Sequence, residues 1–376
     1  MRNGFYGITF LVLNFVMTSC ATLDMKMLKK THSGYPKASE ALFLDSYDTY
    51  KDGSQETLVY LCLSLLYRYE FDKLNECFDA LQDESSGKDQ FHILHNQRSA
   101  YFLETNQNEK LLKEAQESEN RGKYIIGIMM WELEAHALSN LKETPKRKKR
   151  INDLIKMIND YRFKAFFGLM TVGEQWFGPM RSAATTRIYL RQNKIKEARL
   201  KLQEKLPGKH FSEILFEGVF NYLQSGIERT AEAVIDKLNA KENKEIEDMK
   251  YLSDMLDIQM IATLSLKEMN IKNSIQGFRR ILDDKRIFDH KLYYLPSLYY
   301  ISLAYLENDE AKNSKVFWDA FLSELDKIKP NYRTGVIASY QAHIKRDFRD
   351  LKFKSASKFC KRWNKSLKNH KIRCSK

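Results

Sequence analysis

The chain has 376 residues, 43% of them apolar, and carries 62 Lys and Arg against 49 Asp and Glu, a formal net charge of +13. This apolar content over this length can bury a full core, which excludes a disordered chain and a disulfide-dependent miniprotein. Only 6 prolines and 15 glycines interrupt a sequence rich in helix-forming residues, so we expect an all-α fold.

The first nineteen residues have the pattern of a signal peptide. Arg2 supplies a positive charge, and Gly4 to Met17 is an uncharged, mostly apolar run. As a helix this run would cover about 21 Å at 1.5 Å per residue, which is short of the roughly 30 Å hydrocarbon core of a bilayer. We therefore expect a signal segment and not a membrane span.

At the end of this segment the residues Met17-Thr18-Ser19-Cys20 resemble the lipobox of bacterial prolipoproteins. In that family the cysteine thiol is alkylated with diacylglycerol, the signal is cut before it, and the new amino group is acylated with a fatty acid such as palmitate. The resemblance implies a signal peptide over 1–19, lipid attachment at Cys20 and stable membrane anchoring. The alternative is an ordinary secretory signal in which Cys20 has no role.

The same resemblance implies a place in the cell. A lipoprotein of this kind lies in the bacterial cell envelope, and Ala21 stands where inner-membrane lipoproteins carry Asp, which favours the outer membrane facing the periplasm. Residues 20–39 hold scattered Lys, Gly and Pro with little apolar periodicity and are expected to be a lipidated tether.

Four further cysteines fall into two local pairs, Cys62 with Cys77 and Cys360 with Cys374. In an oxidising periplasm either pair can close a loop that stabilises the fold by about 3 kcal/mol. Buried reduced thiols are the alternative for both pairs.

Residues 40–340 have apolar side chains at three- and four-residue spacing, with Gly and Pro between the segments, which predicts antiparallel helical hairpins. Several hairpins resemble the tetratricopeptide repeat (TPR), in which small residues at positions 8 and 20 let the paired helices approach. The matching windows start at Gln55, Pro179, Phe211, Met255 and Leu295. Their spacing is irregular and residues 90–170 match weakly, so we expect an irregular TPR-like solenoid, with an irregular helical bundle as the alternative.

In TPR arrays the first helix of each hairpin lines a concave groove. The resemblance implies that Leu63, Arg187, Tyr299 and Leu303 belong to such a groove, which would suit a peptide or an amphipathic helix. The alternative is that the apolar members pack against a neighbouring helix.

The charge is concentrated in residues 341–376, which contain 13 Lys and Arg and 2 Asp. Phe353, Ala356, Cys360, Trp363 and Leu367 form an apolar stripe there, so we expect a basic amphipathic C-terminal helix. Three interpretations remain open: a helix that caps the last hairpin, contact with anionic lipid or acidic wall polymer, and nucleic-acid binding, which an exported lipoprotein disfavours.

No catalytic signature is present, and no cofactor is expected. His92 with His95 and Glu132 with His136 each have helical spacing, but neither pair has a third ligand nearby in sequence, so no metal site is expected. The basic run Lys146-Arg147-Lys148-Lys149-Arg150 follows Pro145 and is interpreted as a solvated loop face.

Taken together, these features predict a lipid-tethered envelope lipoprotein that is not an enzyme. It would act as a scaffold or adaptor that binds an unidentified envelope protein through the helical-repeat groove. The alternative is a helical envelope enzyme or glycan-binding protein whose site is assembled from residues far apart in the sequence.

Overall fold

The computed structural model describes residues 55–84, 88–121, 127–161, 164–165, 170–171, 174–203, 255–288 and 290–372. This part of the chain is helical apart from one antiparallel pair, in which β1 (Lys164–Ala165) lies beside β2 (Met170–Thr171). The all-α prediction is therefore confirmed for the described residues. Cys20 with its signal peptide and tether, the hairpin starting at Phe211, and Cys374 lie outside them.

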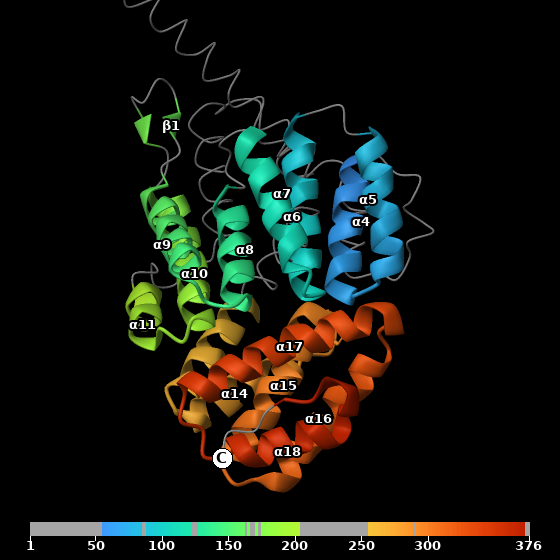
Figure 1. Cartoon of the computed structure of the whole chain (residues 1–376), viewed down its shortest axis with the longest axis vertical. Helices are drawn as coiled ribbons and strands as arrows, with labels where there is room; N and C mark the ends of the chain where they lie inside the picture. Colours follow the sequence, from blue (N-terminus) through green and yellow to red (C-terminus); the bar gives the residue numbers. More distant parts are fainter. Residues whose placement is uncertain are drawn as a thin grey trace, which may run out of the picture.

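Pairs of consecutive helices are joined by short turns (Figure 1). In chain order they are α4 (Gln55–Arg68), α5 (Phe71–Glu84), α6 (Lys88–Glu104), α7 (Asn108–Arg121), α8 (Gly127–Asn140), α9 (Pro145–Asp160), α10 (Glu174–Arg191), α11 (Ile195–Gln203), a helix over 255–267, α14 (Ile271–Leu282), η1 (Lys285–Ile287), α15 (Lys291–Glu307), α16 (Ala311–Asp326), α17 (Pro330–Asp350), α18 (Ala356–Ser366) and η2 (Lys368–His370). Within the described residues, none of these helices is both long enough and apolar enough to cross a bilayer.

Five hairpins are closed by one and the same turn. A single residue with φ between 56° and 61° follows the first helix, and it is never glycine. In the first hairpin the amide of Tyr69 donates to Leu66 O and the amide of Glu70 donates to Leu65 O, which is the Schellman pattern. The same two hydrogen bonds recur around the other four positive-φ residues, which are Asn106, Asn193, Met269 and Asp309.

Two rows of buried residues accompany these turns. Seven residues before each positive-φ position stand Cys62, Ser99, Thr186, Ala262 and Ser302, and five residues after it stand Leu74, Leu111, Ala198, Ser274 and Ser314. All ten are at most 1% exposed. Mostly small side chains at these points let the two helices of a hairpin pack closely. Four of these hairpins overlap the windows that the sequence predicts at Gln55, Pro179, Met255 and Leu295, although α10 and α15 begin a few residues before their windows. The hairpin of α6 and α7 lies in none of the predicted windows.

The first eight helices that the structure describes pair into hairpins that stand in a row. The first helix of each hairpin contacts the first helix of the next one. α4 contacts α6, α6 contacts α8, and α8 contacts α10, while α5, α7, α9 and α11 each pack on their own partner. Figure 1 shows α4 to α8 standing side by side with α9 and α10 continuing the row. We call α4 to α11 the N-terminal array.

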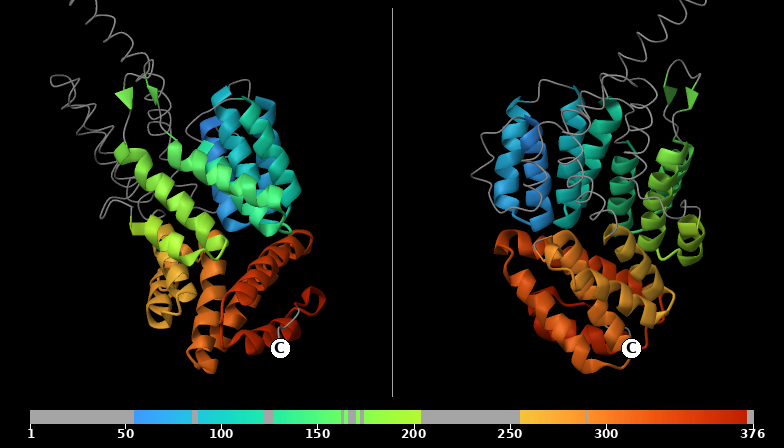
Figure 2. Two further views of the ribbon diagram at one scale, coloured as in Figure 1. Left: turned by 60° about the vertical axis from the view of Figure 1, so that its left-hand side comes forward. Right: turned by 180° about the vertical axis from the view of Figure 1, so that it is seen from behind.

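The helices from α14 onward cross the turn ends of this array, as both views of Figure 2 show. α15 contacts α4, and α17 contacts α6 and α8. The approach is tight at Gly335 of α17, where a Cβ atom would collide with the carbonyl oxygen of Thr105 in the α6–α7 turn. A glycine is therefore required for α17 to lie directly on that turn.

Disulfide bonding occurs both in the N-terminal array and in the helices that follow it. Cys62 of α4 and Cys77 of α5 are joined, with 5.7 Å between their Cα atoms. Of the two alternatives that the sequence leaves open for this pair, the structure has the disulfide. Cys360 is also disulfide-bonded, and Cys374, its predicted partner, lies outside the described residues.

The C-terminal helix caps the last hairpin. Phe353, Cys360 and Trp363 are at most 6% exposed, and Ala356 and Leu367 pack against the same core. The Trp363 ring lies 5.8 Å from that of Trp318 on α16. The apolar stripe of this helix is therefore used inside the fold, as the capping interpretation requires.

Candidate functional site

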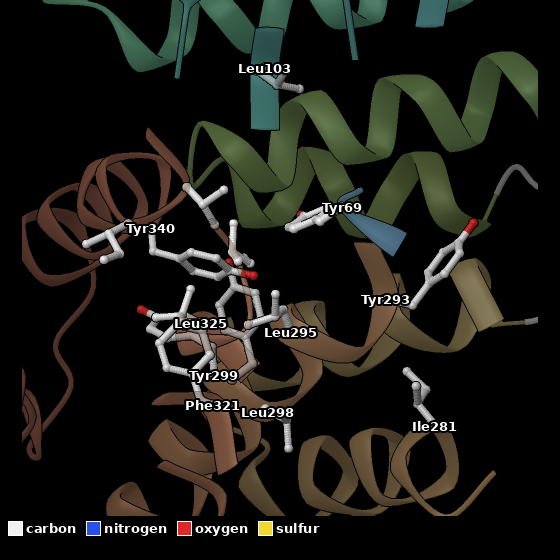
Figure 3. Close-up of a cluster of buried hydrophobic side chains, with 14 of the residues drawn as sticks. Tyr69, Leu103, Ile281, Tyr293, Leu295, Leu298, Tyr299, Phe321, Leu325 and Tyr340 are labelled. Atoms are coloured by element: carbon white, nitrogen blue, oxygen red, sulfur yellow. The ribbon is translucent and has the colours of Figure 1, made fainter. Parts of the chain in front are cut away.

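Tyr299 and Leu303 are core residues, so their assignment to an exposed groove is wrong. Both are 0% exposed. The Tyr299 ring lies 5.9 Å from that of Phe321 and 5.3 Å from that of Tyr340, and Figure 3 shows these three side chains gathered in one cluster. The physical reason is that the C-terminal helices pack on α15 from several sides, so it has no solvent-facing concave surface. Leu63 is half-buried and packs against the same core.

Arg187 lies in an ion pair. Its Nε and Nη2 donate to the two carboxylate oxygens of Glu132 at 2.5 and 2.7 Å, and His136 Nε2 donates to Glu132 Oε1 at 3.1 Å. Burial raises the pKa of Glu132, but Arg187 outweighs it and holds that pKa at about 2. Burial lowers the pKa of His136 to about 4. Because Arg187 occupies both oxygens, this cluster joins α8 to α10 and is not arranged to take a ligand.

A second histidine, His95 on α6, is bonded to Glu114 on α7. Glu117 is near enough to these two residues for a metal ion to be conceivable. However, Arg98 Nη2 lies 3.2 Å from the other Glu114 oxygen, so a cation already neutralises that carboxylate. We interpret the group as an ion-pair network.

A pocket of about 870 Å³ lies where the N-terminal array meets α17. Its walls come from the starts of α7 and α9, the end of α8, the α10–α11 turn and one face of α17. The charged residues among its lining are mostly cationic: Lys142, Arg147, Lys148, Lys194, Lys345, Arg346 and Arg349, against Glu109 and Glu143. We call this hollow the basic pocket.

The inner end of the basic pocket is built around Arg346, which is 8% exposed. Its guanidinium donates to Arg191 O and to Asn140 Oδ1, so it is fixed against the ends of α10 and α8. Beside it, Lys267 Nζ donates to Asp347 Oδ1 at 2.7 Å, with both side chains 3% exposed. Burial and the neighbouring Arg346 lower the pKa of Arg191 to about 10. Positive charge is therefore crowded at this end of the pocket.

The rim carries lysines that have no counter-charge. Lys142, Lys148 and Lys345 are exposed, and within the described part of the chain none of them has a carboxylate at salt-bridge distance. Arg147 is placed between them by a 3.0 Å bond to Lys142 O and a 3.7 Å contact with Glu109. A negatively charged group entering the pocket would meet several donors that are not already neutralised.

The start of α9 points to the same conclusion. The run from Lys146 to Arg150 is not a loop face, because Pro145 opens the helix and Thr144 caps it. Its first turn contains no acidic residue, although the positive end of the helix dipole disfavours cations there by about 0.3–1 kcal/mol each. The cations thus reduce local stability, which suggests that they are present for another reason.

The remaining wall of the pocket is partly apolar. Leu138, Leu141, Ile151, Ala338 and Ala342 line it, and among the residues that the structure describes no aromatic side chain does. Aliphatic surface beside cations suits an acidic chain that also carries aliphatic groups, whereas a sugar ring is usually held against an aromatic face. Sequence reasoning missed Lys345, Arg346 and Arg349 as pocket residues, and the unfavourable charge at the start of α9 is the one local signal that marks the site.

No known protein family, no curated protein and no solved structure matches the chain.

Proposed function

We propose that this protein is a lipoprotein of the bacterial cell envelope, tethered through Cys20, whose helices form a TPR-like scaffold without enzymatic activity. The lipobox resemblance supports the anchor and the location at the periplasmic face of the outer membrane. The shared turn and the two rows of mostly small buried residues, twelve positions apart, support the repeat assignment.

The binding site of this scaffold is the basic pocket. The observation that carries the assignment is its composition: seven cations, only two carboxylates and an aliphatic wall. Its volume lies within the roughly 300–1,000 Å³ typical of binding sites. The occupant proposed here is an acidic segment of a partner protein that also presents aliphatic side chains. Arg187 is held in its ion pair within the array. Tyr299 and Leu303, which the sequence assigned to a groove, are buried and take no part in binding.

The pocket is tested with a fluorescent peptide of alternating Glu and Leu, titrated into the full chain. Lys148→Glu with Lys345→Glu should weaken binding roughly tenfold or more, because two rim attractions become repulsions. The matched control is Lys272→Glu with Lys285→Glu, two exposed lysines outside the pocket. Equal weakening in both variants would show a response to net charge alone and would contradict the site.

A glycan-binding protein is the second candidate, because the same cations would attract an acidic polysaccharide. Polygalacturonate, tested in the same titration, separates the two. Stronger binding of polygalacturonate than of the peptide, lost in the pocket variant, would favour the glycan. The anchor is tested separately by feeding cells a clickable palmitate analogue, which should label the wild-type chain and not Cys20→Ala.

A further inference from the structure

The outer side of α18 is a separate basic surface. Lys358, Lys361 and Lys365 are all exposed and lie on the side of the helix opposite the buried Phe359 and Trp363. Lys352, Lys368 and Lys371 flank them and are also exposed. Residues 351–376 contain no Asp or Glu. We call these six lysines the lysine face.

The helix that carries this face is held rigidly. Trp363 Nε1 donates to His370 O at 2.6 Å, and Asn364 both donates to Ile372 O and accepts from its amide, each at 2.8 Å. On the inner side Phe359 lies 5.3 Å from Trp318, ring to ring. The apolar side is therefore fully used in packing, and α18 cannot turn it toward a membrane without unfolding the cap.

Few acids on the elements packed against α18 offset the lysines. Asp309 in the α15–α16 turn is paired with Lys354 at 2.8 Å, and Asp319 on α16 is paired with Lys315. Within the described residues, Lys361, Lys365, Lys368 and Lys371 have no carboxylate within salt-bridge distance. These four lysines thus form an uncompensated row of positive charge, while Lys358 lies within electrostatic range of Asp309.

The shape of this surface indicates the kind of partner. The face is the convex side of a helix, and the pocket of the protein is lined by other residues. A convex row of cations matches an extended negative surface better than a small ligand. Each Lys close to an anionic bilayer contributes about 1 kcal/mol, roughly a fivefold gain in partitioning, and this attraction fades within a Debye length.

We propose that the lysine face rests on the anionic phospholipid headgroups of a bilayer and so orients the tethered protein on its membrane. The contact is electrostatic and involves no insertion, because the apolar stripe of α18 is buried. It is independent of the basic pocket, and it does not require lipidation of Cys20, so it can be tested without the anchor.

The experiment uses the full chain carrying Cys20→Ala in every sample, with vesicles of phosphatidylcholine alone or with 30% phosphatidylglycerol. In the test variant Lys358, Lys361, Lys365 and Lys368 are all changed to Gln. The matched control changes four exposed lysines elsewhere to Gln, which leaves the same net charge: Lys156, Lys272, Lys285 and Lys312.

The parent protein should prefer the phosphatidylglycerol vesicles and lose that preference as salt rises. The lysine-face variant should partition roughly 600-fold less into them, which is about fivefold for each of the four lysines, and the control variant less than threefold. Equal losses in the two variants, or no preference of the parent for the anionic vesicles, would overturn the proposal. So would unchanged vesicle binding combined with lost retention on immobilised polygalacturonate, which would assign the face to an acidic wall polymer.

A second measurement uses only the parent protein, so it does not depend on whether a variant folds. Lysine acylation of the parent protein, read by mass spectrometry, should show Lys361 and Lys365 protected by phosphatidylglycerol vesicles and Lys272 unprotected. Equal reactivity of all three lysines with and without vesicles would contradict the contact.

Discussion

The basic pocket and the lysine face carry the same sign of charge but differ in shape. In the pocket, cations from four parts of the chain surround an aliphatic wall, and the buried Arg346 stands at its inner end. On the lysine face, the cations come from one short segment and the apolar residues beneath them are buried. Positive charge alone therefore does not identify a partner. The concave site suits an acidic peptide segment, and the convex one suits a flat anionic surface.

The two regions also depend differently on the rest of the fold. The pocket exists only while α17 lies across the turns of the N-terminal array, whereas the lysine face depends on the packing of Phe359 of α18 against α15, α16 and α17 within the C-terminal half. Changes that loosen the junction of the two halves should therefore affect the pocket and spare the lysine face.

The largest effect is expected from breaking the buried pair of Lys267 and Asp347. Asp347→Ala leaves an unpaired ammonium 3% exposed and should reduce the free energy of unfolding by about 3–5 kcal/mol, measured by urea denaturation. Peptide binding in the pocket should weaken with it. Lys267→Met with Asp347→Leu removes both charges and should be destabilised less. A double variant as unstable as Asp347→Ala would contradict this explanation.

Removing the disulfide should lower stability and spare both surfaces. Cys62 and Cys77 close a loop with a sequence separation of 15, so Cys62→Ser with Cys77→Ser should lower the free energy of unfolding by about 3 kcal/mol. Below the unfolding transition, peptide binding and vesicle binding should both remain. Loss of either one at low temperature would show that α4 and α5 shape that surface.

Acid should destabilise the N-terminal array through His136. Its folded pKa of about 4 lies below the ordinary 6.5, so the unfolded chain binds the proton first as the pH falls. The contribution of His136 to the free energy of unfolding is therefore independent of pH above 6.5, and it decreases by about 2–3 kcal/mol as the pH falls from 6.5 to 4.5. Glu132, with a pKa of about 2, adds its own loss only below pH 4.5.

Urea denaturation at pH 7 and pH 5 measures this effect, and His136→Gln should reduce the difference between the two. Burial and the cations Arg191, Arg346 and Lys267 lower the pKa of His343 as well, so His343→Gln should remove part of the remainder. A pH dependence that is unchanged in the double variant would refute the assignment.

The smallest effect is expected at Gly335. Because a Cβ there meets the Thr105 carbonyl, Gly335→Ala should push α17 off the α6–α7 turn and cost about 1–3 kcal/mol. The peptide should bind more weakly, and phosphatidylglycerol vesicles should bind as before. The control is Ala338→Gly on the same helix, which adds no volume and should cost about 1 kcal/mol from helix propensity alone.

Much of the fold follows from local sequence pattern. Helical periodicity predicts the hairpins, and the small residues at Thr186, Ala262 and Ser302 correctly set the register of three of them. The hairpin of α6 and α7 escapes detection although Ser99 and Leu111 stand where the detected first hairpin has Cys62 and Leu74, so these two positions alone do not identify a hairpin. No single residue in the α6–α7 segment is distinctive by itself.

What the sequence by itself determined is the all-α class, the register of most hairpins, the cysteine spacing that allows Cys62 to meet Cys77, and the amphipathic cap, because each depends on residues close together in the chain. Only the tertiary structure decided that Tyr299 and Leu303 are buried and that Lys148 and Lys345 face one hollow. The burial of Tyr299 and Leu303 depends on how α16, α17 and α18 pack around α15, and the hollow depends on how α17 packs across the array. No local pattern encodes which side of a helix a distant neighbour will cover.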